Sequence, residues 1–134
     1  MKINLITSMD NPPLVPDHDN ITMDNIDQIN NSICQSIILN NILKFLTQEQ
    51  FESILRKIRH GGIITIYAPD IMEMSKALYW GTIDLPKFSS LVSHSVTYHT
   101  VKDIKNLLEQ RGYIIEEANI NTESLTFSIK AKRP

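Results

Sequence analysis

The sequence predicts an α/β fold, with a mostly parallel sheet and an antiparallel hairpin at its C-terminal end. Between residues 33 and 110, strand-like runs alternate with helix-like segments, which is typical of parallel strands joined by helical crossovers. Two further strand-like runs then follow with only Asn121-Thr122-Glu123 between them, a connection of hairpin length. At 134 residues and 15.3 kDa the chain has the size of one domain, so we expect a single domain over residues 1–134.

The N-terminal part contains two strand-like segments separated by an irregular one. Residues 2–7 are rich in β-branched side chains and partly alternate, which predicts a strand. Residues 8–31 carry three prolines and five aspartates, so we expect an irregular, acidic and exposed segment, with at most a brief extended piece at 20–23. Residues 33–39 are almost continuously apolar and predict a mostly buried strand.

The next segment has clear helix signals at both ends. A short helical turn is expected at 42–46. Thr47 followed three residues later by Gln50 predicts a capping box that starts a helix. The helix is expected to run to His60, with Gly61 in the left-handed position after its end.

The remainder of the chain opens with an apolar run at 63–68 that is typical of a central parallel strand. Beyond it we expect, in order, a helix over 71–80, a loop over 82–98, a helix over 100–110, and strands over 113–120 and 125–132.

The glycine count excludes two common classes of nucleotide-binding protein. The chain has only four glycines, and none lies in its first 60 residues. A phosphate-binding loop needs glycines because the backbone must turn tightly and approach the ligand closely. The sequence therefore contains neither a P-loop nor a GxGxxG dinucleotide loop.

Charge and cysteine content narrow the class of protein further. The net charge of −2 and a pI near 6.0 provide no general attraction to nucleic acid or to anionic membranes. A single cysteine makes no internal disulfide, and no apolar run reaches about 18 residues, the length of a membrane span. We expect a cytoplasmic protein without nucleic-acid or membrane partners.

Four segments carry a resemblance to a known family. They are Lys2-Ile3-Asn4-Leu5, Ile42-Leu43-Lys44-Phe45-Leu46, the stretch from Leu55 to Asp70 with its Gly61-Gly62 turn and Pro69-Asp70, and the stretch from Val101 to Lys132 with Leu107-Leu108-x-x-Arg111-Gly112-Tyr113. In this order they resemble the class I S-adenosylmethionine-dependent methyltransferases, especially the small members that begin Met-Lys-Leu-x-Leu-Gly-x-Gly. The resemblance implies a Rossmann-like methyltransferase sheet.

The chain departs from that family where the cofactor binds. Residues 7–13 stand where the family has its Gly-x-Gly loop, and residues 8–32 are too few for the helix and two strands that the family places next. The sheet is therefore expected to be truncated, with its first strand left as an edge that either the acidic segment 8–31 covers or a second copy of the chain pairs with. In such sheets the ligand lies at the carboxyl ends of the strands. The positions left for S-adenosylmethionine there are vestigial: Ser8, Asp10, Leu39, Asn40 and Asp70.

Several polar residues allow a functional and a structural interpretation. Asp70 fits a general base, but a helix N-cap after Pro69 is the better interpretation. The family often places substrate-contacting residues near His94 and His99, but without a partner acid we expect a polar surface loop. His18, between two aspartates, fits a weak metal ligand, but a solvated acidic loop is favoured and no metal is expected. No catalytic residue is assigned.

Two functional hypotheses follow. The first is a methyltransferase-like module that binds no cofactor, does not catalyse, and binds a protein partner or a second copy of itself through the edge of the first strand. The second is an active S-adenosylmethionine-dependent enzyme with a remodelled or intersubunit site, acting on a small molecule or a glycan. One apolar cluster fits either core or a partner surface: Met72, Met74, Leu78, Tyr79 and Trp80.

Overall fold

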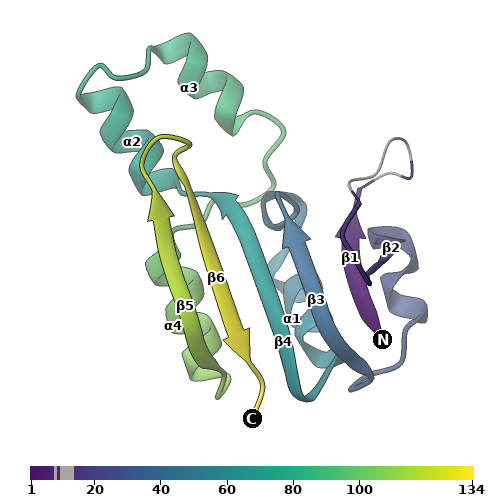
Figure 1. Cartoon of the computed structure of the whole chain (residues 1–134). Coiled ribbons are helices and arrows are strands. Elements are labelled where there is room, and N and C mark those ends of the chain that lie inside the picture. The colour runs from purple at the N-terminus through teal and green to yellow at the C-terminus, as the bar shows by residue number, and fades with distance from the viewer. Residues whose placement is uncertain (8, 10–13) are drawn as a thin grey trace.

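The computed structural model describes residues 1–7, 9 and 14–134 and contains a six-stranded sheet in the order β2-β1-β3-β4-β6-β5 (Figure 1). The strands are β1 (Lys2–Ile6), β2 (Asp19–Thr22), β3 (Cys34–Asn40), β4 (Ile58–Pro69), β5 (Ile114–Asn121) and β6 (Thr126–Lys132). The helices are η1 (Met23–Gln28), η2 (Leu43–Phe45), α1 (Gln48–Lys57), α2 (Ile71–Tyr79), α3 (Leu85–Val92) and α4 (Val101–Gln110), where η marks 3₁₀ turns.

Strand directions confirm the predicted fold class. Strands β2, β1, β3 and β4 are mutually parallel, whereas β6 is antiparallel to both β4 and β5. The last two strands are therefore the expected hairpin. The capping box of α1 is also confirmed, because the Thr47 side chain accepts from the Gln50 N–H while the Gln50 side chain accepts from the Thr47 N–H.

One face of the sheet carries the core. Helices α1 and α4 lie behind the sheet in the view of Figure 1, and their buried residues, such as Phe51 and Leu108, join the apolar cluster of the strands. Every second residue of a central strand points into this layer; Ile64 and Ile66 of β4 are fully buried. Burial of these side chains between two layers is the main source of stability.

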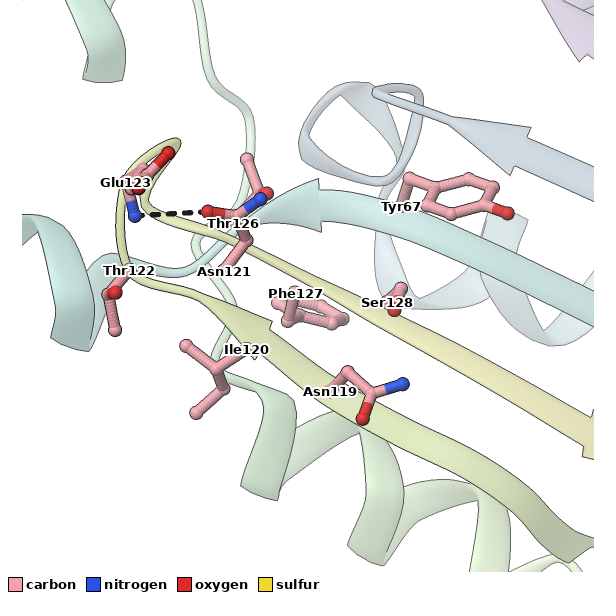
Figure 2. Close-up of a pocket in the computed structure, with 9 residues that line it drawn as sticks. All are labelled: Tyr67, Asn119, Ile120, Asn121, Thr122, Glu123, Thr126, Phe127 and Ser128. Atoms are coloured by element: carbon pink, nitrogen blue, oxygen red, sulfur yellow. Dashed lines mark hydrogen bonds between the residues drawn. The ribbon is translucent and has the colours of Figure 1, made fainter.

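The opposite face carries no helix in the described part of the chain (Figure 1). Residues 14–18 cross part of it, where the His18 ring hydrogen-bonds the Ser36 hydroxyl of β3 at 2.9 Å. Over β4, β5 and β6 the alternate residues are half-buried or exposed and mostly polar. A hollow of about 620 Å³ lies on this face beside the β5–β6 hairpin (Figure 2).

The first strand is not an open edge: residues Asp19–Thr22 of the acidic segment cover it, which is one of the two arrangements expected for this edge. β1 lies between β2 and β3, with Ile3–Ile6 paired to Asp19–Thr22. The segment 8–31 is therefore less irregular than expected: its brief extended piece forms β2 and continues into η1. An Asn4–Asn20 side-chain hydrogen bond of 3.0 Å adds to the pairing. Backbone pairing covers the edge of β1, and the described residues between β1 and β2 contain no α-helix.

Two boundaries also differ from the sequence prediction. The helix α1 ends at Lys57, three residues before His60, because Ile58 adopts an extended conformation and pairs with Cys34 of β3. Gly61, at φ +77°, consequently lies within β4, where its N–H donates to the Arg133 carbonyl at 2.7 Å.

A helix, α3, occupies part of the expected loop over 82–98. Its N-terminus is capped by the Asp84 side chain, and Pro86 lies in its first turn. None of its residues is fully buried, but its apolar residues Leu85, Phe88, Leu91 and Val92 follow a helical spacing that was not recognised in the sequence. None of the helices in the described ranges is long and apolar enough to cross a membrane. The cytoplasmic location stays a prediction.

Candidate functional site

The chain order places a candidate ligand crevice between β1 and β3. From β1 the chain goes to β2 on one side, and it then returns to β3 on the other, so the strand order reverses at this point. In open parallel sheets, ligands bind outside the carboxyl ends of the strands at such a reversal. The relevant ends are Ile6 of β1, Asn40 of β3 and Pro69 of β4.

The end of β3 is shaped by a pair of asparagines. The Asn40 side chain is exposed, whereas the preceding Leu39 is fully buried in the core and exposes no atom at this end of the strand. Asn41 adopts a left-handed conformation at φ +58°, and its N–H donates to the Tyr67 carbonyl at 2.8 Å. Asparagine tolerates this conformation better than most residues. The turn therefore holds β3 and β4 together at the crevice.

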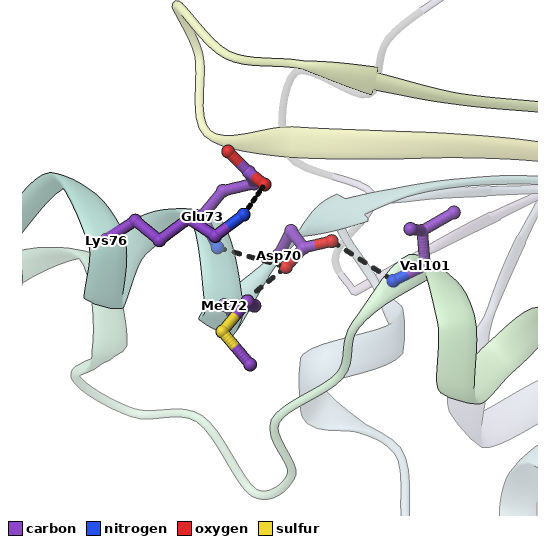
Figure 3. Close-up of polar contacts among 5 residues, drawn as sticks. All are labelled: Asp70, Met72, Glu73, Lys76 and Val101. Atoms are coloured by element: carbon purple, nitrogen blue, oxygen red, sulfur yellow. Dashed lines mark hydrogen bonds and ion pairs between the residues drawn. The ribbon is translucent and has the colours of Figure 1, made fainter.

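Asp70 joins the N-termini of two helices (Figure 3). Its Oδ1 accepts from the N–H groups of Met72 and Glu73 at 2.9 and 3.2 Å, and its Oδ2 accepts from the Val101 N–H at 3.1 Å. The residue is only 1% exposed. The predicted N-cap of α2 is confirmed, and the contact to α4 was not foreseen because it spans 31 positions. Both carboxylate oxygens already accept hydrogen bonds from backbone N–H groups. The predicted role of Asp70 in cofactor binding is not tested by these contacts and stays a prediction.

The segment 95–99 is held against the η2 turn. The N–H groups of Val96 and Thr97 donate to the Lys44 carbonyl at 2.7 and 3.1 Å. The Thr97 hydroxyl lies 3.0 Å from the Leu46 carbonyl, to which it donates, and 2.7 Å from His99 Nε2. These contacts bring residues about 50 positions apart to the same end of the sheet.

The two histidines of this region lie in different environments. His94 is exposed, as expected for a surface loop, but His99 is half-buried, so the expectation of a surface loop is wrong for it. Burial lowers the pKa of His99, and its hydrogen bond to the Leu43 backbone and the Asp103 charge act in the opposite direction. His99 lines a groove of about 340 Å³ whose floor is apolar, with Phe51 and Leu107 among its lining residues.

Two of the predicted cofactor positions, Ser8 and Asp10, lie outside the described residues, and their roles stay predictions. One acid was missed. The family resemblance implies a second strand that ends in an acid for the cofactor ribose, and the exposed Asp24 follows β2 directly after Met23. The extended piece expected at 20–23 contained the signal, but it was not connected with the acid that follows it. No group of three or more metal-ligating side chains occurs among the described residues.

The apolar cluster of α2 is divided between core and surface. Met74 is buried, whereas Met72, Tyr79 and Trp80 are 54%, 80% and 75% exposed. The two aromatic rings form an edge-to-face pair with centroids 5.0 Å apart. Helices α2 and α3 project beyond the carboxyl end of β4 (Figure 1). We call these two helices, residues 71–92, the arm.

Comparison with known proteins rests on structure alone, since neither a protein-family model nor a curated protein matches the sequence. A S-adenosylmethionine-dependent methyltransferase from Mesorhizobium loti is similar with a TM-score of 0.63 at 14% identity, over 98% of this chain and 80% of that one. A second S-adenosylmethionine-dependent methyltransferase, from Archaeoglobus fulgidus, has a TM-score of 0.54 at 13% identity, over 87% of this chain and 68% of that one. An O-methyltransferase family protein from Burkholderia thailandensis gives 0.56 at 11% identity, over 87% of this chain but only 36% of that one.

These structures confirm the resemblance inferred from sequence at the level of fold. The chain has a class I S-adenosylmethionine-dependent methyltransferase-like fold, a Rossmann-like sheet with an antiparallel C-terminal pair. Fold alone does not imply activity, which depends on the residues at the site.

Proposed function

We propose that this chain is a methyltransferase-like module that does not transfer methyl groups and acts by binding a protein partner. One observation carries the proposal: the sequence between β1 and β2 contains no glycine. A loop that wraps closely around a nucleoside-sized ligand needs glycine because any Cβ would restrict the turn and the approach of the backbone. Without that loop, the crevice lacks most of the converging polar groups that hold such a ligand.

The arm provides the surface for a partner. Tyr79, Trp80 and Leu85 are 80%, 75% and 63% exposed and lie on or between α2 and α3. Large aromatic side chains are enriched in the energetic centres of protein interfaces, where they fill pockets of the partner. A helix such as α3, which buries no residue within its own chain, gains stability when its apolar side is covered. We therefore expect the partner to be a protein with an apolar groove that accepts these side chains.

The sheet edges favour a different chain over a second copy. β1 is internal, so a dimer through its edge is no longer proposed, and the edge strand β2 has only four residues. At the other edge, β5 has a register irregularity between Ile115 and Glu117, and both Glu116 and Glu117 are exposed. Bulges and charged side chains protect edges from pairing with other chains.

The alternative is an active methyltransferase that acts on a small molecule or a glycan. Asp24 favours it, because an acid after the second strand is what the resemblance implies for the cofactor ribose. Asn40 would then offer an amide from the opposite side of the crevice.

Titration calorimetry with S-adenosylmethionine and S-adenosylhomocysteine separates the two functions. We expect no heat of binding at millimolar ligand, which would exclude the alternative. Micromolar binding that disappears in Asp24→Ala would overturn the proposal. An Asp27→Ala variant, which changes an exposed acid in the same turn, is the matched control.

The partner surface is tested by affinity purification from the source cells with wild type and a Tyr79→Ala, Trp80→Ala double variant. We expect the double variant to lose a protein that wild type and Tyr67→Ala retain. Equal recovery by all three proteins would contradict an interface on the arm. Thermal unfolding should be almost unchanged, since both side chains of the arm are largely exposed.

A further inference from the structure

The hollow on the helix-free face of the sheet has the chemistry of a ligand site. It begins beside the candidate crevice, because Tyr67 is the pairing partner of Asn40, and it extends away from the crevice over β6 and β5. We propose that it binds a neutral saccharide, with Tyr67 as the stacking platform and Ser128 and Asn119 as hydrogen-bonding groups. The inference does not depend on cofactor binding or on the arm.

Strand register brings these three residues into one row. Tyr67 of β4 is the pairing partner of Ser128 of β6, which in turn pairs with Asn119 of β5. All three line the hollow, and Figure 2 shows their side chains along three adjacent strands. Tyr67 is 45% exposed, so much of its side chain is accessible. Pairing between strands, and not a mobile loop, fixes the spacing of the row.

The polar groups of this row are available to a ligand. Within the described part of the chain, the Tyr67 hydroxyl, the Ser128 hydroxyl and the Asn119 amide make no hydrogen bond to other residues. Hydroxyls and amides both donate and accept hydrogen bonds, as the hydroxyls of a sugar do. The row therefore suits a ligand with many hydroxyl groups, which both donate and accept hydrogen bonds.

The hairpin forms a fixed wall at one end of the hollow. Asn121 Oδ1 accepts from the N–H groups of Glu123 and Ser124 at 3.0 and 3.1 Å, which closes the turn. The hydroxyls of Ser124 and Thr126 are 2.6 Å apart. A site ordered in advance in this way loses less conformational entropy when a ligand binds.

The lining of the hollow disfavours anionic ligands and wholly apolar ligands. Among the described residues that line the hollow none is Lys, Arg or His, and Glu123 is the one acid, so a phosphate or carboxylate would meet no cation. Lys130 lies two positions along β6, where Glu117 of β5 is its pairing partner and opposes its charge. A wholly apolar ligand would leave the hydroxyls and the amide without partners, which costs affinity.

Size and shape agree with a short saccharide. The hollow measures about 620 Å³, within the range of about 300–1,000 Å³ that is typical of small-molecule sites. One aromatic ring beside a row of neutral polar groups offers a surface for the C–H face of a sugar ring and hydrogen bonds for its hydroxyls.

The test is a titration of the ¹⁵N-labelled chain with maltotetraose, cellotetraose and N,N′,N″,N‴-tetraacetylchitotetraose at millimolar concentration, followed by NMR. We expect at least one of these sugars to shift the amide resonances of residues 67, 119 and 128, while adenosine monophosphate shifts none of them. Shifts from none of the three sugars, or equal shifts from the nucleotide, would overturn the proposal.

Variants then assign the binding to the row. Tyr67→Ala should weaken binding about tenfold, and Asn119→Asp, which keeps the size but removes the amide donor, should weaken it several-fold. Tyr79→Ala removes an exposed tyrosine on the arm and should leave binding unchanged. Equal affinity for Tyr67→Ala and Tyr79→Ala would contradict the assignment, and thermal unfolding of each variant shows whether the fold is kept.

Discussion

The two parts of the sheet, residues 1–33 and residues 34–134, are built in different ways. In the second part the strands have seven to twelve residues, and capped α-helices lie between them. In the first part β1 and β2 have five and four residues, and no α-helix is found in its described residues. Even so, Ile3 and Leu5 of β1 belong to the same buried core as the long strands.

This difference shows that the residues that stabilise the sheet are not the same as the residues expected to bind a ligand. Backbone pairing and a few buried side chains keep β1 and β2 in the sheet. A ligand site between β1 and β3, however, would depend on the connection that leaves β1, and in sequence that connection is where the chain departs most from the pattern of the methyltransferase family. The fold is thus shown by the structure, whereas reduced cofactor binding is our proposal.

The largest effect is expected from Asp70→Ala, which acts on the second part. Its carboxylate caps α2 and also accepts from the first N–H of α4, and all three donors would lose their partner. A lost cap costs about 0.5–2 kcal/mol and a buried unsatisfied donor about 1–3 kcal/mol, so we expect a loss of about 3 kcal/mol in the free energy of unfolding. Urea unfolding measures it.

The control is Asp84→Ala, which removes the single exposed cap of α3. Because α3 buries no residue, this variant should reduce the local helicity of the arm with little change in the urea midpoint. Equal midpoints for the two alanine variants would show that the contact of Asp70 with α4 contributes nothing.

A smaller effect is expected from glycine replacements at the start of β4. A Cβ on Gly62 would lie 2.8 Å from the Cys34 carbonyl oxygen and 2.9 Å from that of Arg59, so backbone must move. Gly62→Ala should cost about 2 kcal/mol. At Gly61 nothing lies within 4 Å, but φ is +77°, so Gly61→Ala should cost about 1 kcal/mol. Thermal unfolding compares them, and a larger loss at Gly61 would contradict the packing argument.

The sequence predicted the second part well because its signals are local. The capping box of α1, the apolar run of β4 and the short connection before β6 each lie within a few neighbouring residues. The end of α1 was misplaced because Ile58 fits the helical apolar face as well as it fits a strand, and only its pairing with Cys34 decides between them. The pattern of neighbouring residues in the sequence gives no information about that contact between strands.

The first part and the site were harder to predict for the same reason. β2 is a strand because β1 lies beside it, not because four residues have a strong strand preference. Asp24 was missed as a consequence. The N-cap of α2 by Asp70 was predicted correctly, whereas its contact with α4 and the position of His99 against η2 depend on tertiary packing.

A third prediction compares the local stability of the two parts. Asn20→Ala removes the side-chain hydrogen bond between β2 and β1 and should lower the opening free energy of the β2 amides by about 1 kcal/mol. The amides of Ile64 and Ile66 in β4 should keep their protection, because they lie in the central, fully buried layer. Native-state hydrogen exchange measures both. Equal loss of protection in β2 and β4 would show that the two parts open as one unit.

The smallest expected effect is a pH dependence that originates from His99. Burial holds its pKa below the usual value, so the unfolded chain binds the proton more readily than the folded one. The stability contributed by the neutral ring is complete above the ordinary histidine pKa of about 6.5 and is lost as the pH falls from there toward the folded-state pKa. His99→Gln keeps a polar side chain beside Thr97 and should flatten the fall in urea midpoint between about pH 7.5 and pH 5.5. The exposed His60, replaced in the same way, is the control. If both variants flattened the profile equally, the effect would come from the loss of any histidine charge and not from burial of the His99 ring against η2. The pH dependence would then not be specific to the second part of the sheet.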